Sequence, residues 1–141
     1  MLKVLLAVDG SENALRAGDA VIRRAREAKG GYEVHLVNVQ HPLHGGISTF
    51  VNQAQIKDYH HDEGMRALAP AREKFDAAGI PCEVHLFVGE PAQVIARYAR
   101  EQGFDEIVIG TRGLTPVAGL VLGSVASKIV HLAEVPVLLV K

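Results

Sequence analysis

KVLLAVDGS, residues 3–11, begins with an apolar run that has no polar face until it reaches Asp9. A strand of this composition is buried on both sides, as in a parallel sheet that carries helices on both faces. Ser11 then offers a helix N-cap, and apolar residues follow at helical spacing until Gly30 and Gly31 end the pattern. The segment therefore predicts a buried strand that leads directly into a covering helix.

The same alternation of a short apolar run and a longer helical pattern continues along the rest of the chain. Pro70 falls inside the helix predicted over residues 51–78, and its missing N–H should divide that helix into two pieces or bend it. Five strands alternating with four helices predict the α/β class, with right-handed crossovers onto one open parallel sheet. After the first strand, the predicted strands are residues 32–39, 81–88, 104–110 and 135–141.

The composition fits one domain over residues 1–141, because no linker or low-complexity segment divides the chain. Hydrophobic residues make up 48% of it and aromatic residues only 5%, so the core must consist mainly of Val, Leu, Ile and Ala. With 15 basic and 16 acidic residues and no Lys/Arg run, nucleic acid and anionic membrane surfaces are excluded as partners. The N-terminal apolar run is too short for a secretory signal, no stretch approaches a membrane span, and Cys82 is the single cysteine. We therefore expect a cytoplasmic protein.

The loop after the fourth predicted strand is rich in glycine. Residues 110–130 read GTRGLTPVAGLVLGSVASKIV, with Gly110 and Gly113 at the start and Gly123 and Ser124 where a helix begins. Glycine lets the backbone approach a phosphate without a Cβ and allows positive φ, and the free N–H groups of a first helical turn attract anions. The same residues also fit a chain turn and a plain helix cap, so both interpretations stay open. A Walker P-loop is excluded because no Lys-Ser or Lys-Thr pair follows a glycine at the required distance.

Two predicted strands end in residues suited to a binding site. Asp9 follows the first strand, and Gly110 ends the fourth. In an open α/β sheet, ligands bind beyond the carboxyl ends of the strands, where the strand order reverses. Asp9 also fits a structural role as a cap for the turn that follows it.

The histidines do not follow the spacing of a known metal site. HPLH at residues 41–44 and HHDE at residues 60–63 match no zinc-ligand pattern, so we interpret both as solvated surface. His35 and His85 alternate with apolar neighbours, and we interpret them as sheet residues rather than ligands or bases. The repeated tetrapeptide EVHL that contains them indicates two similar buried strands rather than an internal repeat. We assign no metal ligand.

Several segments together resemble the universal stress protein family over nearly the whole chain. The glycine loop matches that family's ATP-binding pattern of Gly, two residues, Gly, nine residues, Gly, and then Ser or Thr. VDGS at 8–11, VGEP at 88–91 and PVLLVK at 136–141 resemble further family signatures in the right order. The resemblance implies a sheet of order 3-2-1-4-5 whose switch point lies between the first and fourth strands.

The resemblance also implies roles for individual residues. Asp9 would face the ribose, and Val39 would contact adenine through its backbone. Arg112 is a further candidate on its own chemistry, as the one cation that the loop could supply. In residues 114–122, LTPVAGLVL, Leu114, Pro116 and Gly119 stand where the family commonly carries basic or polar residues, and Thr115 is the only hydroxyl. AMP and ADP therefore stay open beside ATP, with or without Mg²⁺. The residues that would hold the phosphates are Gly110, Gly113, Gly123, Ser124 and Val125.

By the same resemblance, the terminal strand at 135–141 would join two copies of the chain into a homodimer and cover an apolar sheet edge. The leading hypothesis is a cytoplasmic stress-response protein that acts as a nucleotide-dependent regulatory switch. One alternative is a slow ATPase, or an enzyme that phosphorylates its own Thr115 or Ser124, although Asp9 is the only carboxylate expected near the loop. The other alternative is an interaction module that binds no nucleotide.

Overall fold

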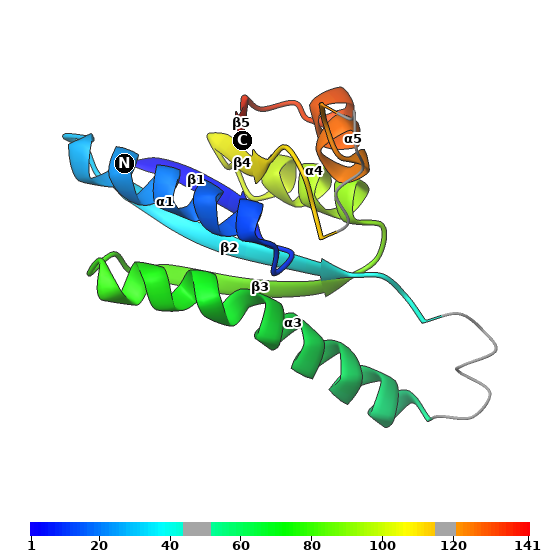
Figure 1. Cartoon of the computed structure of the whole chain (residues 1–141). Coiled ribbons are helices and arrows are strands. Elements are labelled where there is room, and N and C mark those ends of the chain that lie inside the picture. The colour runs from blue at the N-terminus through cyan, green and yellow to red at the C-terminus, as the bar shows by residue number, and fades with distance from the viewer. Residues whose placement is uncertain (44–51, 115–120) are drawn as a thin grey trace.

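The computed structural model describes residues 1–43, 52–114 and 121–141. Within them, strands and helices alternate along the chain as predicted (Figure 1). The strands are β1 (Leu2–Ala7), β2 (Tyr32–Gln40), β3 (Cys82–Val88), β4 (Glu106–Gly110) and β5 (Val137–Val140). The helices are α1 (Glu12–Glu27), α3 (Gln53–Ala77), α4 (Pro91–Glu101) and α5 (Ser124–Leu132).

All the strands are parallel, and their order across the sheet is β3-β2-β1-β4-β5. This result confirms both the α/β class and the strand order 3-2-1-4-5. Helices α1 and α3 cover one face of the sheet, and α4 and α5 cover the other (Figure 1). The strand order reverses beside β1, so the switch point lies between β1 and β4.

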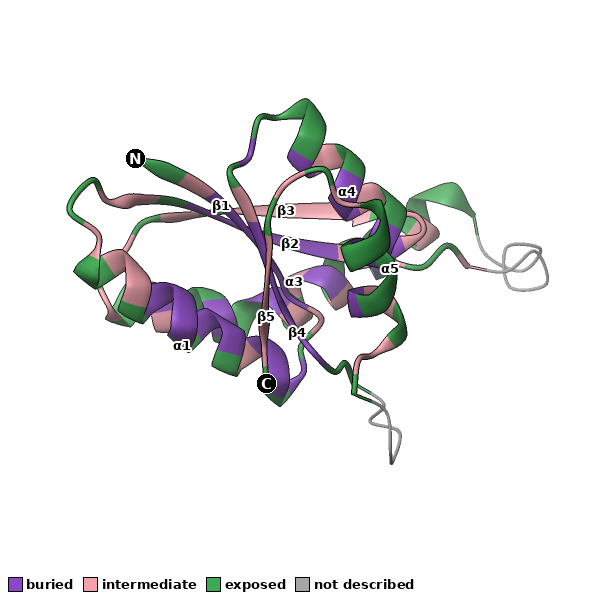
Figure 2. Ribbon diagram, turned by 90° about the horizontal axis from the view of Figure 1, so that it is seen from above, coloured by how far each residue is buried: buried purple, intermediate pink, exposed green. Residues whose placement is uncertain are grey.

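The packing of β1 explains why its sequence has no polar face. Val4 and Leu6 pack under α1 and α3, whereas Leu5 points to the opposite face, under α4 and α5. All three side chains have no solvent exposure, and burying each one contributes about 1.5–3 kcal/mol relative to exposure. Figure 2 shows the same concentration of buried residues along the central strands.

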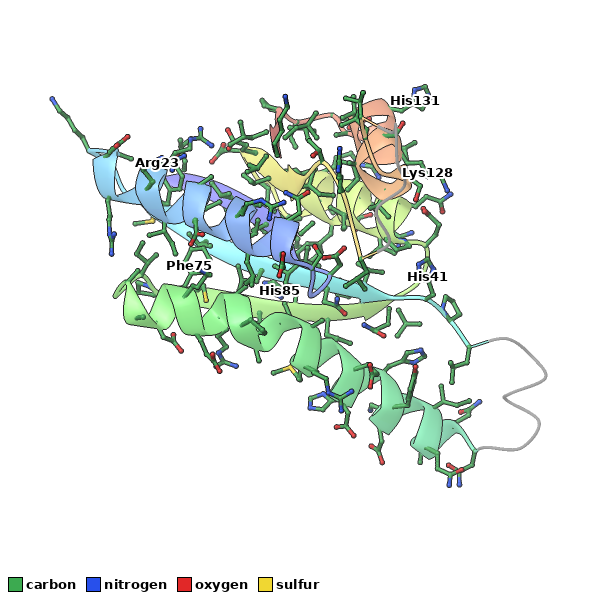
Figure 3. All side chains as sticks on the ribbon, viewed as in Figure 1. Arg23, His41, Phe75, His85, Lys128 and His131 are labelled. Atoms are coloured by element: carbon green, nitrogen blue, oxygen red, sulfur yellow. The ribbon has the colours of Figure 1, made fainter. Side chains whose placement is uncertain are left out.

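Helix α1 begins as predicted at Ser11, whose hydroxyl accepts a hydrogen bond from the N–H of Ala14 at 3.1 Å. Further along the helix, Gly18 lies against α3, because a Cβ on it would be 3.7 Å from the ring of Phe75. Phe75 is fully buried and points from α3 toward α1 (Figure 3). A glycine and an aromatic ring therefore bring the two helices of this face into contact.

Helix α3 runs without a break although it contains Pro70. The predicted division into two pieces is therefore wrong, whereas the axis of the helix does bend along its length in Figure 1. Leu68, Ala71 and Phe75 flank the proline and have no exposure, so packing on the sheet offsets the missing hydrogen bond. Neither α3 nor any other helix in the described ranges has the length and apolar character needed to cross a membrane.

Strands β4 and β5 each begin two residues later than predicted. Strand β4 begins at Glu106 rather than at residue 104, because the N–H of Phe104 bonds to the carbonyl of Ala99 and so belongs to the end of α4. Strand β5 begins only after Pro136, which has no N–H to give to a sheet ladder. The later start of β4 does not move its carboxyl end at Gly110, where a ligand is expected.

Candidate functional site

A pocket of about 430 Å³ opens at the carboxyl ends of the parallel strands, beside the switch point between β1 and β4. Open α/β sheets bind ligands at this position. The ends of β1, β2 and β4 and the first turn of α5 contribute to its lining. The site residues predicted from the sequence all line it: Asp9, Val39, Gly110, Arg112, Gly113, Gly123, Ser124 and Val125.

Asp9 lies just after β1 with its carboxylate near the glycine loop. Its Oδ1 accepts a hydrogen bond from the N–H of Ser11 at 2.9 Å, so Asp9 does cap the turn before α1. Its Oδ2 lies so near Gly113 that a Cβ on that glycine would be only 3.0 Å away. Asp9 therefore combines a structural contact with a position in the pocket, and the loop can pass beside it because residue 113 has no side chain.

The glycines of the loop allow close packing rather than a left-handed backbone. Positive φ was one reason to expect glycine here, but none of Gly110, Gly113 and Gly123 adopts it. A Cβ on Gly110 would lie 2.6 Å from Oδ1 of Asn13, and one on Gly123 would lie 3.4 Å from the carbonyl oxygen of Thr111. The N–H of Gly123 donates to that carbonyl at 2.6 Å, which holds the two ends of the loop together.

The first turn of α5 carries the donors that a phosphate needs. Gly123 is the N-cap and no side chain caps the helix, so the hydroxyl of Ser124 is not used in capping. The N–H groups of Ser124, Val125 and Ala126 belong to this turn and have no hydrogen-bond partner among the described residues. Such amides, with the partial positive charge of a helix N-terminus, form an anion-binding surface.

Few charged groups line the pocket. In the described part of the lining, Asp9 is the only carboxylate and Arg112 the only arginine or lysine. Leu114 also lines the pocket but is 68% exposed, so it does not fill the space. Thr115, a candidate phosphorylation site in the sequence, lies outside the described residues.

The backbone of Val39 is open toward the pocket. The carbonyl of Val37 accepts a hydrogen bond from the N–H of Val8 at 2.8 Å, and the carbonyl of Gln40 accepts one from Gly89 at 2.9 Å. Alternate residues of a strand direct their N–H and C=O groups to opposite neighbours, so Val39 directs its own toward β1. Because β1 has already ended at this level, Val39 presents a donor and an acceptor to the pocket.

The whole chain, residues 1–141, matches the model of the universal stress protein family. The chain belongs to this family. A relative, the universal stress protein YxiE of Bacillus subtilis, is 31% identical over 147 residues, covering 99% of this chain and 98% of the relative. The resemblance seen in the sequence is thereby confirmed.

Two solved structures share the fold of this universal stress protein. A universal stress protein in complex with cAMP is 27% identical, with a TM-score of 0.72 and coverage of 99% of this chain and 97% of that one. The universal stress protein from Archaeoglobus fulgidus in complex with dAMP is 28% identical, with a TM-score of 0.73 and coverage of 100% and 98%. Both likenesses extend over the full length of the fold.

Asn13 of α1 shapes the site of this universal stress protein and is not among the residues predicted from the sequence. Its side chain is buried, its Oδ1 accepts from the N–H of Arg112 at 2.7 Å, and its Nδ2 donates to the carbonyl of Val140 at 3.0 Å. The one signal in the sequence was a polar residue beside Ala14 in a first helical turn, where Asn commonly occurs for capping. Gly110 therefore makes room for the structural side chain of Asn13.

The histidines considered as metal ligands lie in different surroundings. His60 is buried, and its Nε2 lies 3.1 Å from the carbonyl oxygen of His41. The expected solvated position is therefore wrong for His60, whereas His61 is exposed. His44 lies outside the described residues.

Proposed function

We propose that this universal stress protein binds an adenine nucleotide in the pocket beside β1 and β4. The observation that carries the proposal is that one pocket joins the open backbone of Val39 to the amides of the first turn of α5. Its volume of about 430 Å³ lies in the range of small-molecule sites. The complexes of related proteins with cAMP and with dAMP support the same class of ligand.

In the proposed orientation, adenine exchanges hydrogen bonds with the N–H and C=O of Val39 and packs on apolar side chains such as Ile95. The ribose lies near Asp9, whose Oδ2 is free to accept hydrogen bonds from its hydroxyl groups. The first phosphate accepts hydrogen bonds from the amides of Ser124 and Val125 and from the Ser124 hydroxyl. The absent side chains of Gly110, Gly113 and Gly123 let protein groups pack closely around this position, as Asn13 and Asp9 do.

The proposed ligand is AMP, ADP or ATP. The first turn of α5 offers enough hydrogen-bond donors for one phosphate. Further phosphates would find only the guanidinium of Arg112 among the cationic side chains of the described lining. Mg²⁺ would prefer oxygen ligands, and Asp9 is the carboxylate near enough to contribute one. We therefore propose tighter binding of AMP than of ATP in the absence of Mg²⁺.

The proposed role is binding and not catalysis. Hydrolysis of ATP requires a positioned water and neutralisation of the transferred phosphate. Asp9 is the only carboxylate of the described lining, and its Oδ1 already accepts from the N–H of Ser11. We infer a cytoplasmic stress-response protein that signals through its nucleotide-bound state as a homodimer.

Calorimetric titration with AMP tests the proposal on two serines of the same helix. Ser124 lines the pocket, whereas Ser127 is exposed and does not line it. Ser124→Ala removes one hydrogen bond to a charged phosphate, so we expect AMP binding to weaken by roughly tenfold. Ser127→Ala is the matched control and should bind AMP like the wild type.

Gly113→Val completes the same experiment. A valine places its Cβ only 3.0 Å from Oδ2 of Asp9, closer than an ordinary van der Waals contact. The carboxylate or the loop must therefore move, and both line the pocket. We expect no measurable binding of AMP, with thermal unfolding of the ligand-free variant as the check on folding. Undiminished binding by both Gly113→Val and Ser124→Ala would contradict the proposed site, and no binding by the wild type would contradict the proposed function.

A further inference from the structure

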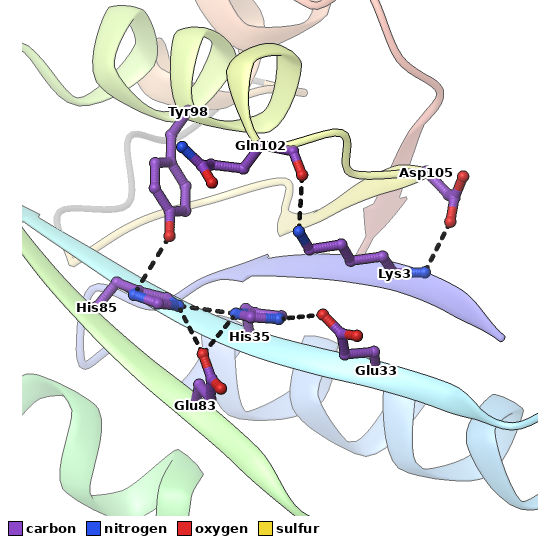
Figure 4. A network of polar contacts seen from close by, with 8 residues as sticks. All are labelled: Lys3, Glu33, His35, Glu83, His85, Tyr98, Gln102 and Asp105. Atoms are coloured by element: carbon purple, nitrogen blue, oxygen red, sulfur yellow. Dashed lines mark hydrogen bonds and ion pairs between the residues drawn. The ribbon is translucent and has the colours of Figure 1, made fainter.

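The sequence Glu-Val-His occurs in both β2 and β3, starting at Glu33 and at Glu83. The two strands are neighbours, and their register pairs His35 with Glu83 and Val37 with His85. The two copies are therefore staggered by two residues. Because side chains alternate between the faces of a strand, both histidines and both glutamates point to the face that α4 covers (Figure 4).

Three potential ligand atoms from this cluster lie at the spacing that a metal ion requires. Nδ1 of His35 lies 2.7 Å from Nε2 of His85, and these atoms lie 3.5 Å and 3.8 Å from the same carboxylate oxygen of Glu83. Tetrahedral zinc with bonds of about 2.0–2.1 Å separates its ligand atoms by about 3.3 Å, close to the mean of these distances. A point equidistant from all three atoms lies about 2.0 Å from each of them.

The surrounding residues hold the two imidazole rings in this arrangement. Nε2 of His35 lies 2.7 Å from a carboxylate oxygen of Glu33, and Nδ1 of His85 lies 3.4 Å from the hydroxyl of Tyr98 (Figure 4). The ring planes are within 11° of parallel, with centroids 5.0 Å apart, and Phe104 packs edge-on against His35. A hydrogen bond from the second ring nitrogen of a histidine to a carboxylate is the usual support of a metal ligand.

The charge of the cluster is also suited to a divalent cation. In the described parts of the chain, neither Glu33 nor Glu83 forms an ion pair with a lysine or arginine. The nearby Lys3 instead donates to the carbonyl of Gln102 at 2.6 Å.

We propose that His35, Glu83 and His85 form a Zn²⁺ site between β2 and β3, with water as the fourth ligand. The protein ligands are Nδ1, one carboxylate oxygen and Nε2, respectively. Two imidazoles and one carboxylate form a ligand set that zinc accepts in four-coordinate geometry. None of these residues lines the pocket of the proposed function, so the zinc site is independent of nucleotide binding.

The protons of the cluster can be accounted for in both states. Without metal, Nε2–H of His35 donates to Glu33, Nε2–H of His85 donates to Nδ1 of His35, and the Tyr98 hydroxyl donates to Nδ1 of His85. When zinc binds both ring nitrogens, the hydrogen bond between the rings is lost, and the proton of His85 moves to Nδ1, where it donates to the Tyr98 oxygen. Both rings stay neutral, and Glu33 keeps its contact.

An ion can reach the site from solvent. The side chain of Glu83 is 72% exposed and that of His85 is 21% exposed, whereas His35 is buried at 8%. These exposed fractions place the carboxylate of Glu83 at the entrance of the site and His35, the most buried ligand, at the back. Strand β3 forms one edge of the sheet, which explains why this part of the face is open.

Zinc titration of the whole chain tests the proposal. The protein is first dialysed against a chelator and then titrated with Zn²⁺ in competition with a chromophoric chelator. We expect one high-affinity zinc ion per chain, and intense visible absorption typical of four-coordinate geometry when Co²⁺ replaces Zn²⁺. Glu83→Gln and His85→Gln should each weaken zinc binding by about tenfold or more.

His61→Gln is the matched control, because His61 is an exposed histidine on α3, away from the cluster. It should leave zinc affinity unchanged. Circular dichroism checks the fold of each variant, and if His85→Gln does not fold, the exposed Glu83→Gln decides. The proposal is overturned if the wild type binds no stoichiometric zinc, if Glu83→Gln binds it as tightly as the wild type, or if His61→Gln weakens it equally.

Discussion

Asn13 joins three parts of the chain through one buried amide. It bonds to the N–H of Arg112 in the glycine loop and to the carbonyl of Val140 in β5. Asn13→Ala leaves the N–H of Arg112 without its partner, whereas the carbonyl of Val140 keeps its hydrogen bond from the N–H of Thr111. We therefore expect the free energy of unfolding to fall by roughly 1–3 kcal/mol. Urea denaturation measures the change. Arg112→Ala is the control, because Asn13 contacts only the backbone of Arg112, and an equal loss in both variants would contradict this account.

At the scale of single elements, α3 contains a replaceable defect. Pro70 is exposed, lies inside the helix and gives no N–H to the carbonyl of Arg66, four residues earlier. Pro70→Ala restores that hydrogen bond and removes the steric crowding, so we expect the free energy of unfolding to rise by about 1–3 kcal/mol. Because α3 does not line the pocket, AMP affinity should not change. A lower urea midpoint in Pro70→Ala would show that the bend of α3 is needed for packing.

Features that depend on adjacent residues could be predicted from the sequence, whereas those that depend on distant contacts could not. The Ser11 cap follows from local chemistry, and the structure confirms it. Phe104 has the character of a strand residue, but its N–H bonds to Ala99 at the end of α4. The close contact of Gly110 with Asn13 joins two elements that sequence spacing does not relate. Loop spacing therefore located the lining of the pocket but not the side chain that supports it.

The stagger between β2 and β3 is a second example of the same limit. The repeated tetrapeptide EVHL is visible in the sequence, but an in-register pairing would place His35 opposite His85, and the observed register places it opposite Glu83. Register depends on how α3 and α4 pack on the two faces, which is a property of the assembled sheet. In the sequence, His35 and His85 therefore look like ordinary sheet residues. The contact between their rings, on which the zinc proposal depends, arises only from the register of the two strands.

At the scale of the whole molecule, β5 leaves one edge of the sheet without a partner strand in the described structure. The carbonyls of Pro136 and Val140 accept hydrogen bonds from β4 and the residue after it, so the backbone groups of Val137 and Leu139 point to the free edge. Val130 and Leu132 of the adjacent α5 are 48% and 42% exposed. An apolar edge of this kind favours pairing with a second copy, which supports the proposed homodimer.

Proline substitutions can distinguish the free edge of β5 from the side that pairs with β4. Val137→Pro removes an N–H that points outward, a change that an edge strand tolerates, so we expect a folded monomer. Leu138→Pro is the matched variant, because its N–H points toward β4, and we expect it to unfold at a lower urea concentration. Light scattering after gel filtration should give the wild type twice the 15.1 kDa of one chain. A monomeric wild type, or a Val137→Pro variant that remains dimeric, would show that residues 135–141 do not join two copies.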